Sequence, residues 1–206
     1  MTPEQKSALL VAAQALRAET LDRFFVLRRL FPVLKEGNGS DEDHEQFRAA
    51  FAGFYQLTGQ MVTKEFKAEF FAELLALDLS QEPSPHKRLL LALKKIPSTR
   101  GLGRLEFSFV SKLVATHDDA QPIYDSNVRR FLGVPGIPSS GEDSDRIARF
   151  LDRLELIRAS YESWHPHFDE LCRPLIDRMP ELASCHPNKV WDFLTWRAGA
   201  KPEKNK

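Results

Sequence analysis

The sequence predicts an all-α protein, and three observations support this fold class. Apolar residues recur at intervals of three and four along most of the chain, which is the period of an amphipathic helix. No segment shows the sustained alternation of apolar and polar residues that is typical of a half-buried strand. The 206 residues, 42% hydrophobic and 28% charged, suffice for a packed core. We therefore expect one helical domain over residues 1–200 and a disordered tail at 201–206.

The first two helices are marked by their ends. Thr2, Pro3 and Gln5 place a capping residue, a first-turn proline and a capping-box glutamine at the start of the first helix. A second helix is expected over residues 21–30. It should end before Pro32, because proline lacks the backbone N–H that a helix interior requires.

Two helices rich in phenylalanine should follow a loop at residues 36–40. One covers residues 41–57, and Thr63 caps the next. Their inward positions carry Phe47, Phe51, Phe54, Phe66, Phe70 and Phe71. Because aromatic rings commonly fill helix interfaces, we interpret this series as core. Two prolines within residues 80–85 then interrupt the helical pattern.

From residue 85 onward the chain should contain six more helices. Ser140 and Asp143 offer a capping pair for the longest of them, after a loop at residues 133–141. The expected helices cover residues 85–95, 105–116, 126–132, a long segment with its apolar stripe over 147–157, about 165–178 and about 187–197.

The charges of the chain balance but are unevenly distributed. Lys and Arg number 29, as do Asp and Glu, which excludes a uniformly basic nucleic-acid-binding surface. Residues 86–131 nevertheless hold 9 Lys and Arg against 4 Asp and Glu, a net charge of +5. The flanking parts, residues 1–85 and 132–206, are net acidic. This distribution is typical of a localised anion-binding surface.

Nothing in the composition predicts a membrane span, a secretion signal, a cofactor or a metal. The longest apolar runs are too short to cross a bilayer, and the first twenty residues lack a cleavage pattern, so we expect a cytoplasmic protein. The two cysteines are too few for a disulfide framework. A zinc alternative rests on His165, His167, Cys172, Cys185 and His186, but their spacing fits no finger pattern and we predict no metal.

A glycine-containing turn between residues 96 and 104 is the first candidate site. Gly101 and Gly103 flank one apolar residue, which lets the backbone approach a partner closely, and Arg100 and Arg104 bracket them. Amides at the following helix start would suit a phosphate. The alternative interpretation is a tight connection between two helices.

A second turn, about twenty residues later, carries the resemblance to a known family. The string Pro-Ile-Tyr-Asp-Ser-Asn-Val-Arg-Arg at residues 122–130 resembles the Pro-Val-Asp-Thr-His-Val-x-Arg string of the helix-hairpin-helix DNA glycosylase superfamily. Residues 107–112, Phe-Ser-Phe-Val-Ser-Lys, also look like a divergent bacterial branch similar to 8-oxoguanine glycosylases. The resemblance covers about 45 residues within the segment 86–131. It implies the helix-hairpin-helix glycosylase fold, with the hairpin near residues 96–104.

The resemblance implies a catalytic role for Asp125, which would stabilise positive charge on the sugar as the base departs. The alternative is that Asp125 or Ser126 only caps the following helix. Bifunctional members carry a lysine nucleophile where this chain has Arg104, and arginine cannot form a Schiff base. Lys112, or Lys94 or Lys95 before the hairpin, would have to replace that lysine, with Lys112 the preferred candidate, so we expect a monofunctional enzyme that uses water.

The resemblance also implies contacts to double-stranded DNA. The residues implied to contact the backbone phosphate are Arg100, Gly101, Gly103 and Arg104. Arg129 and Arg130 are implied as further contacts. Tyr124 and Trp164 are candidates to stack on an extruded base, although ordinary packing is the alternative for both.

The expected function is therefore excision of a damaged base, with an oxidised purine as one candidate, by a monomeric DNA glycosylase-like protein. The alternative is a non-catalytic helical module that binds nucleic acid or protein. The zero net charge and the three residues between Pro97 and Gly101, where the family has none, favour this alternative.

Overall fold

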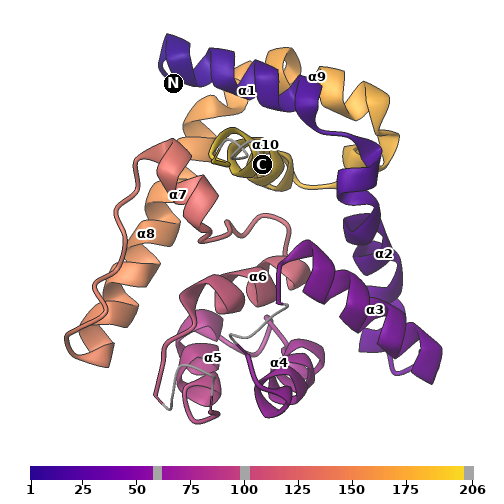
Figure 1. Cartoon of the computed structure of the whole chain (residues 1–206), viewed down its shortest axis with the longest axis vertical. Helices are drawn as coiled ribbons and strands as arrows, with labels where there is room; N and C mark the ends of the chain where they lie inside the picture. Colours follow the sequence, from indigo (N-terminus) through magenta and orange to yellow (C-terminus); the bar gives the residue numbers. More distant parts are fainter. Residues whose placement is uncertain (58–61, 98–102, 202–206) are drawn as a thin grey trace, which may run out of the picture. The chain divides into compact units, whose positions relative to one another are not determined.

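The computed structural model describes residues 1–57, 62–97 and 103–201 and contains no β-strand in these ranges (Figure 1). The predicted all-α class is confirmed for this part of the chain. The fold divides into two compact units, Met1–Arg17 with Ala115–Lys206, and Ala18–Val114. We name them the terminal unit and the central unit and describe each by itself.

The central unit is built on phenylalanine packing. Its helices are α2 (Ala18–Lys35), α3 (Asp41–Phe54), α4 (Lys64–Ala76), α5 (Pro85–Leu93) and the part of α6 (Phe107–His117) that precedes the unit boundary. Helices α2 and α3 lie side by side (Figure 1). Phe51 is fully buried, with its ring centroid 5.3 Å from that of Phe70 and 5.6 Å from that of Phe71. The aromatic series therefore forms a core, as its spacing predicts.

Helix starts in this unit are fixed by side-chain caps. Ser40 and Asp43 form a capping box at α3, and the Thr63 hydroxyl accepts from the Phe66 N–H at α4. The expected end of the second helix before Pro32 is wrong, because α2 continues to Lys35. Leu34, one turn beyond Leu30, is buried, and its burial offsets the hydrogen bond that Pro32 removes.

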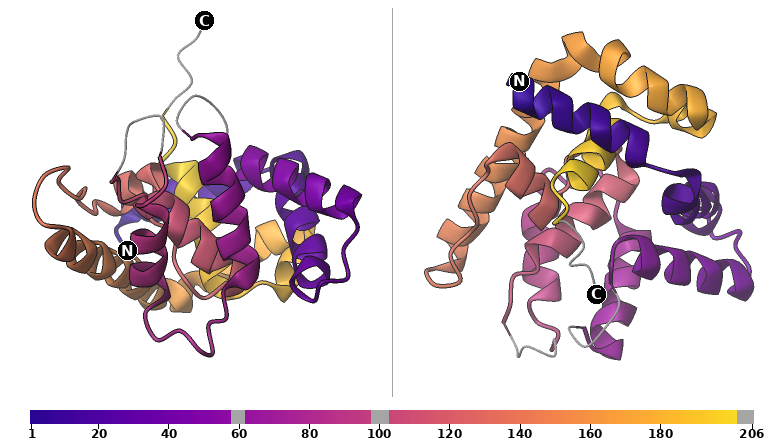
Figure 2. Two further views of the ribbon diagram at one scale, coloured as in Figure 1. Left: turned by 90° about the horizontal axis from the view of Figure 1, so that it is seen from below. Right: turned by 45° about the horizontal axis from the view of Figure 1, so that its top comes forward.

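The terminal unit is arranged around its last helix. It contains α1 (Pro3–Ala15), α7 (Ser126–Leu132), α8 (Asp143–Trp164), the 3₁₀ turn η1 (His165–His167), α9 (Phe168–Arg178), the 3₁₀ turn η2 (Pro180–Ser184) and α10 (Pro187–Ala198). Helix α10 packs against α1, α7 and α8, and α1 lies beside α9 (Figure 2). Hence α10 contributes to most of the interfaces between the α-helices of this unit.

Two predicted features of the terminal unit change in detail. The helix expected over 165–178 begins as the 3₁₀ turn η1, which contains Pro166, and becomes α-helical at Phe168. Helix α8 has Glu142 as its N-cap, without a side-chain capping bond, in place of the expected pair of Ser140 and Asp143. None of the helices in the described ranges combines the length and apolar character that crossing a membrane requires.

Candidate functional site

Asp125 stands at the start of α7, where its carboxylate caps the helix. Its backbone is extended (φ −110°, ψ 153°), and Oδ1 accepts a hydrogen bond of 2.8 Å from the Asn127 N–H. The side chain is half-buried. Of the two capping alternatives, the structure therefore has Asp125 and not Ser126. A capping carboxylate also lies at the positive end of the helix, so this role is compatible with catalysis.

The connection between α6 and α7, which carries Asp125 at its end, is held by side chains of α10. Asn188 Nδ2 donates to the Ala120 carbonyl at 2.9 Å, and Lys189 Nζ donates to the Ala115 carbonyl at 3.1 Å. The Ile123 N–H donates to Asp192 Oδ1 at 3.4 Å. Three side chains of one helix thus hold the last turn of α6, at Ala115, and two points of the connection that follows it, at Ala120 and Ile123.

These anchoring residues form a buried polar face on an otherwise apolar helix. They share a helical spacing and almost complete burial, with exposed fractions of 3, 0, 3 and 0%: Asn188, Lys189, Asp192 and Thr195. Residues three, four or seven positions apart lie on the same side of an α-helix, and Asp192 stands in such a relation to each of the other three. Because fully buried lysine and aspartate are rare unless paired, this face requires a purpose beyond filling space.

Asp192 is the centre of this face. Its Oδ1 accepts from the Tyr161 hydroxyl at 2.8 Å, and its Oδ2 lies 3.9 Å from Lys189 Nζ. Lys189 Nζ is also 4.0 Å from Asp119 Oδ1. Oδ2 of Asp192 has no hydrogen-bond partner among the described residues. The carboxylate is therefore buried with one oxygen fully engaged and the other held only by charge.

The electrostatics of Asp192 follow from this burial. Burial raises the pKa of its carboxyl to about 7, against the Lys189 ammonium and the bonds from Tyr161 and Ile123, which all lower it. The charge of Asp125 raises the pKa further, so the two carboxylates interact. Burial likewise raises the pKa of the Tyr161 hydroxyl well above its usual value. Tyr161 therefore stays a hydrogen-bond donor at neutral pH.

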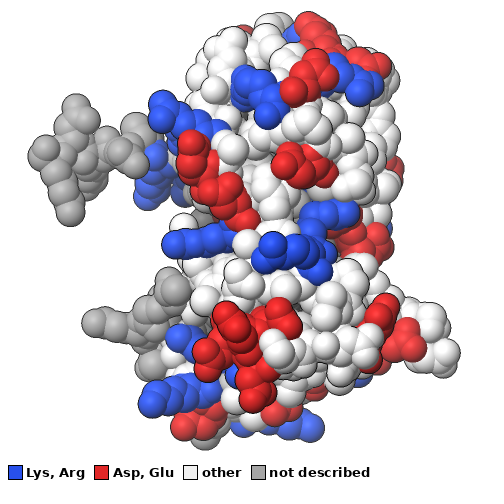
Figure 3. All heavy atoms as spheres, turned by 90° about the vertical axis from the view of Figure 1, so that its right-hand side faces the viewer, with Lys and Arg blue, Asp and Glu red and all other residues white. Residues whose placement is uncertain are grey.

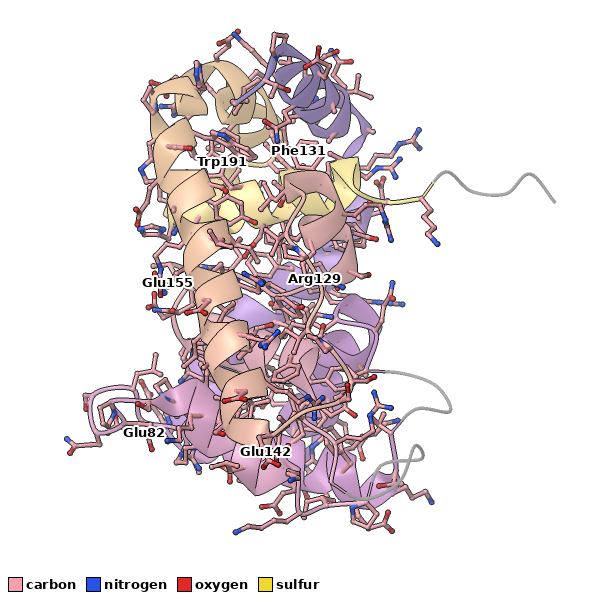
Figure 4. The ribbon with its side chains drawn as sticks, turned by 90° about the vertical axis from the view of Figure 1, so that its left-hand side faces the viewer. Glu82, Arg129, Phe131, Glu142, Glu155 and Trp191 are labelled. Atoms are coloured by element: carbon pink, nitrogen blue, oxygen red, sulfur yellow. The ribbon has the colours of Figure 1, made fainter. Side chains whose placement is uncertain are left out.

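The far end of α10 fixes α7 as well. A Cβ at Gly199 would lie 2.0 Å from the Asn127 carbonyl oxygen, so only glycine permits this approach. Arg130 donates to the Gly199 carbonyl and, at 3.0 Å, to Asn127 Oδ1. Figure 4 shows Phe131 of α7 and Trp191 of α10 in the same region near the end of α8. The first turn of α7, with Asp125, is thus held by Asp192 through the preceding connection and by the close approach of Gly199.

The residues expected to contact DNA differ in their exposure and in the partners they already have within the chain. Arg129 stacks its guanidinium 4.8 Å from the Tyr124 ring centroid, and Arg130 has the partners given above. Arg104 is exposed and lies 3.4 Å from Glu106. Gly103 adopts φ +80°, which glycine permits because it has no Cβ. Its N–H donates to the Lys94 carbonyl at 3.2 Å.

Two of the expected phosphate contacts, Arg100 and Gly101, lie outside the described residues. On the face drawn in Figure 3, Lys and Arg side chains are interspersed with Asp and Glu. This face therefore presents no uniformly basic surface to a phosphate backbone.

Lys112, the candidate nucleophile, belongs to the central unit. It is 8% exposed, and its Nζ donates to the Tyr55 carbonyl at 3.2 Å and lies 5.8 Å from the Tyr55 ring centroid. The amine is thus engaged by a carbonyl and an aromatic face within its own unit.

The two candidate stacking residues are buried among other rings. Tyr124 meets Phe150 edge-on, with centroids 5.5 Å apart. Trp164 packs on Trp191, Phe131 and Tyr161, with centroid distances of 5.7, 6.2 and 6.2 Å. The packing interpretation describes both rings as they are placed here, and stacking on an extruded base would require them to turn outward.

The histidines and cysteines considered for zinc do not converge. The described residues contain no group of three or more His, Cys, Asp or Glu arranged to hold a metal ion. Cys172 is buried, which raises the pKa of its thiol, and His186 accepts from the Asn188 N–H as the N-cap of α10.

Sequence reasoning missed the polar face of α10. The signal was present, since Lys189 and Asp192 interrupt the apolar residues Val190, Trp191 and Leu194 and stand three positions apart. Charged residues on both sides of an apolar stripe are ordinarily assigned to the solvent-facing side. Only the packing of α10 inside the terminal unit shows that they face inward.

Comparison of this chain with protein-family models, curated proteins and solved structures finds no match. The fold and the site define a helical protein in which the buried polar face of one helix holds an aspartate-bearing turn.

Proposed function

We propose that this chain is a DNA glycosylase-like protein that binds double-stranded DNA and hydrolyses the N-glycosidic bond of a damaged base, with Asp125 as the central carboxylate. One observation carries the proposal: the Asp125 turn is anchored by buried, charged residues of α10. A helix cap alone needs none of this support, whereas a catalytic group must be held in one geometry. The resemblance of residues 122–130 to the glycosylase turn assigns the chemistry.

The proposed reaction consumes one water molecule. The bond between C1′ of the sugar and the base nitrogen breaks, and its electron pair leaves with the base. The water oxygen bonds to C1′ and loses a proton, and the departing base takes up a proton, which leaves an abasic site. The Asp125 carboxylate would stabilise the positive charge that builds on the sugar.

Water is preferred to an amine as the nucleophile because of Lys112. Its Nζ is buried and donates to the Tyr55 carbonyl, and it would have to give up this bond to attack a sugar carbon. Strand cleavage through a Schiff base would require Lys112 to leave this environment. The proposal is therefore a monofunctional enzyme.

A second candidate function is a non-catalytic module that keeps the fold for binding nucleic acid or protein. The observation that favours its protein-binding form is that two of the expected DNA contacts already have partners within the chain. Arg129 stacks on Tyr124, and Arg130 binds the Gly199 carbonyl. Both guanidinium groups therefore have a partner within the chain before any phosphate is bound.

A strand-nicking assay separates these functions. Labelled duplexes that contain 8-oxoguanine, uracil, hypoxanthine or an alkylated purine are incubated with the wild type and with Asp125→Asn, and each is developed with and without alkali. Asp152→Asn is the matched control, because Asp152 is an exposed aspartate of α8 in the same unit. The proposal predicts product only after alkali, at equal rates for the wild type and the control.

For Asp125→Asn we expect a loss of about a hundredfold or more, the usual effect of removing one electrostatic stabiliser. Cleavage without alkali would contradict the monofunctional mechanism and indicate Lys112. Salt-dependent duplex binding with no product from any lesion would support the binding module. Absence of binding even at low salt would contradict both nucleic-acid functions.

A further inference from the structure

Asp192 connects the polar face of α10 to the turn that carries Asp125. Its Oδ1 accepts from the Ile123 N–H at 3.4 Å and from the Tyr161 hydroxyl at 2.8 Å. Tyr161 Oη lies 3.0 Å from Thr195 Oγ1, and that hydroxyl donates to the Trp191 carbonyl at 2.8 Å. The acceptor for Ile123 is therefore held in turn by groups from α8 and α10.

The bond to Ile123 acts on Asp125 through a short piece of backbone. The Asp125 N–H donates to the Ile123 carbonyl at 3.1 Å, and the Arg129 N–H donates to the Asp125 carbonyl at 2.9 Å. Ile123 itself is buried. A fixed Ile123 amide therefore fixes the backbone of Asp125 and the first turn of α7.

We propose that Asp192 is a positioning residue for Asp125, holding its turn through the Ile123 amide and adding a second negative charge that interacts with that of Asp125. The inference rests on the proposed function and adds to it a residue that touches neither the base nor the sugar. Asp192 combines two properties that an ordinary anchor lacks, a titratable group and a charge that interacts with Asp125.

The charge of Asp192 is governed by groups on three elements. Lys189 faces it from α10, Tyr161 from α8 and Asp125 from the start of α7, while Asp119 faces Lys189. Because burial raises the pKa of Asp192 to about 7, the carboxyl loses its proton near neutral pH. Two anions stabilise a cationic sugar better than one, so excision should accelerate as the pH rises through this range.

Three variants separate the charge of Asp192 from its hydrogen bonds. Asp192→Asn keeps an oxygen that can accept from Ile123 and Tyr161 but removes the charge. Asp192→Ala removes both. Tyr161→Phe keeps the ring but removes a bond that lowers the pKa of Asp192, so it moves the titration of Asp192 to higher pH.

The test is the single-turnover excision rate between pH 5.5 and 8.5, measured for the wild type, the three variants and Asp152→Asn. We expect the wild-type rate and that of Asp152→Asn to rise through pH 7. Asp192→Asn should match the wild type at pH 5.5, lack the rise and be slower by about tenfold at pH 8.5. Asp192→Ala should be slow at every pH, and Tyr161→Phe should rise at higher pH than the wild type.

Exchange of the Ile123 amide proton provides a readout that is independent of activity. We expect faster exchange in Asp192→Ala and wild-type protection in Asp192→Asn, since only the first removes the acceptor. A wild-type pH profile in Asp192→Asn, or unchanged amide exchange in Asp192→Ala, would overturn the positioning role while leaving the proposed function intact. A wild type that excises no lesion would overturn the proposed function, and with it the role of Asp192.

Discussion

The two units of this chain differ in the groups that dominate their interiors, although Lys112 is buried in the central unit and Trp164 packs among rings in the terminal unit. The central unit packs phenylalanine rings against each other, with Phe51 within 5.6 Å of both Phe70 and Phe71. The terminal unit buries a lysine and an aspartate on α10, with Tyr161 against them. The first arrangement contributes stability directly, through area removed from water and ring contacts.

Buried apolar area and ring contacts do not account for the second arrangement, the polar face of α10. A buried ion pair contributes little or nothing compared with apolar residues of the same volume, because both charges lose their hydration. The polar face of α10 therefore adds little or nothing to the stability of the fold. We infer that it serves another purpose. The groups it binds, the Ala115 carbonyl and the Ile123 amide, belong to the chain that leads to Asp125. The comparison teaches that the interior of the terminal unit is shaped by the turn it holds.

The largest expected effect lies in the aromatic core. Phe51→Ala should lower the free energy of unfolding by about 3–5 kcal/mol, the usual cost of removing a buried ring and leaving a cavity. Because no charge is involved, the loss should be the same at pH 5 and pH 8. Denaturant unfolding followed by circular dichroism measures it. Leu91→Ala, at a position 39% exposed, is the control, and an equal loss there would contradict the assignment of Phe51 to the core.

The next effect breaks the buried pair. Lys189→Met should cost about 3 kcal/mol, because it leaves the Asp192 carboxyl buried without its cation. The loss should be greater at pH 8 than at pH 5, since protonation of Asp192 at the lower pH removes the stranded charge.

The control for this variant is Lys35→Met. Lys35 is an exposed lysine that donates to the Leu75 and Leu77 carbonyls. The loss of stability caused by Lys35→Met should be small and equal at both pH values. A pH-independent loss for Lys189→Met would show that Asp192 does not carry the charge assigned to it.

The third prediction concerns Asp192 itself. Its pKa is higher in the folded than in the unfolded state, so between about pH 4 and 7 the folded state binds more proton. The contribution of Asp192 to stability is therefore greatest below pH 4 and is lost as the pH rises through 7. Relative to Asp192→Asn, the wild type should lose more than about 1 kcal/mol across this window, since each pKa unit corresponds to about 1.4 kcal/mol. Parallel unfolding curves at all pH values would contradict this.

The smallest effects compare one helix cap in each unit. Ser40→Ala should cost about 1 kcal/mol, because it removes the capping bond to the Asp43 N–H. Asp125→Asn should change stability by less than about 0.5 kcal/mol, because asparagine caps as well as aspartate. Thermal unfolding of both variants measures this. A large loss for Asp125→Asn would mean that its charge is structural.

Much of the fold could be predicted because local signals specify it. The caps at Thr2 and Thr63 and the helix at Ser126–Leu132 follow from residue type and short-range hydrogen bonds. The end of α2 could not be predicted, because the burial of Leu34 outweighs the local effect of Pro32.

The candidate site divides in the same way. Asp125 could be found, since a short string carries it. Asp192 could not, because it lies 67 positions from Asp125 and its role depends on which face of α10 turns inward. The link between them is a bond from the Ile123 backbone, and a backbone amide has no sequence signal of its own.

The most direct test of the central claim is the excision rate of Asp125→Asn on a lesion that the wild type cuts, measured on protein whose thermal unfolding matches the wild type. The account predicts an intact fold and a rate lower by about a hundredfold or more, because the carboxylate charge is lost while the cap remains. Equal excision by the two proteins would contradict it and leave Asp125 as the N-cap of α7 alone.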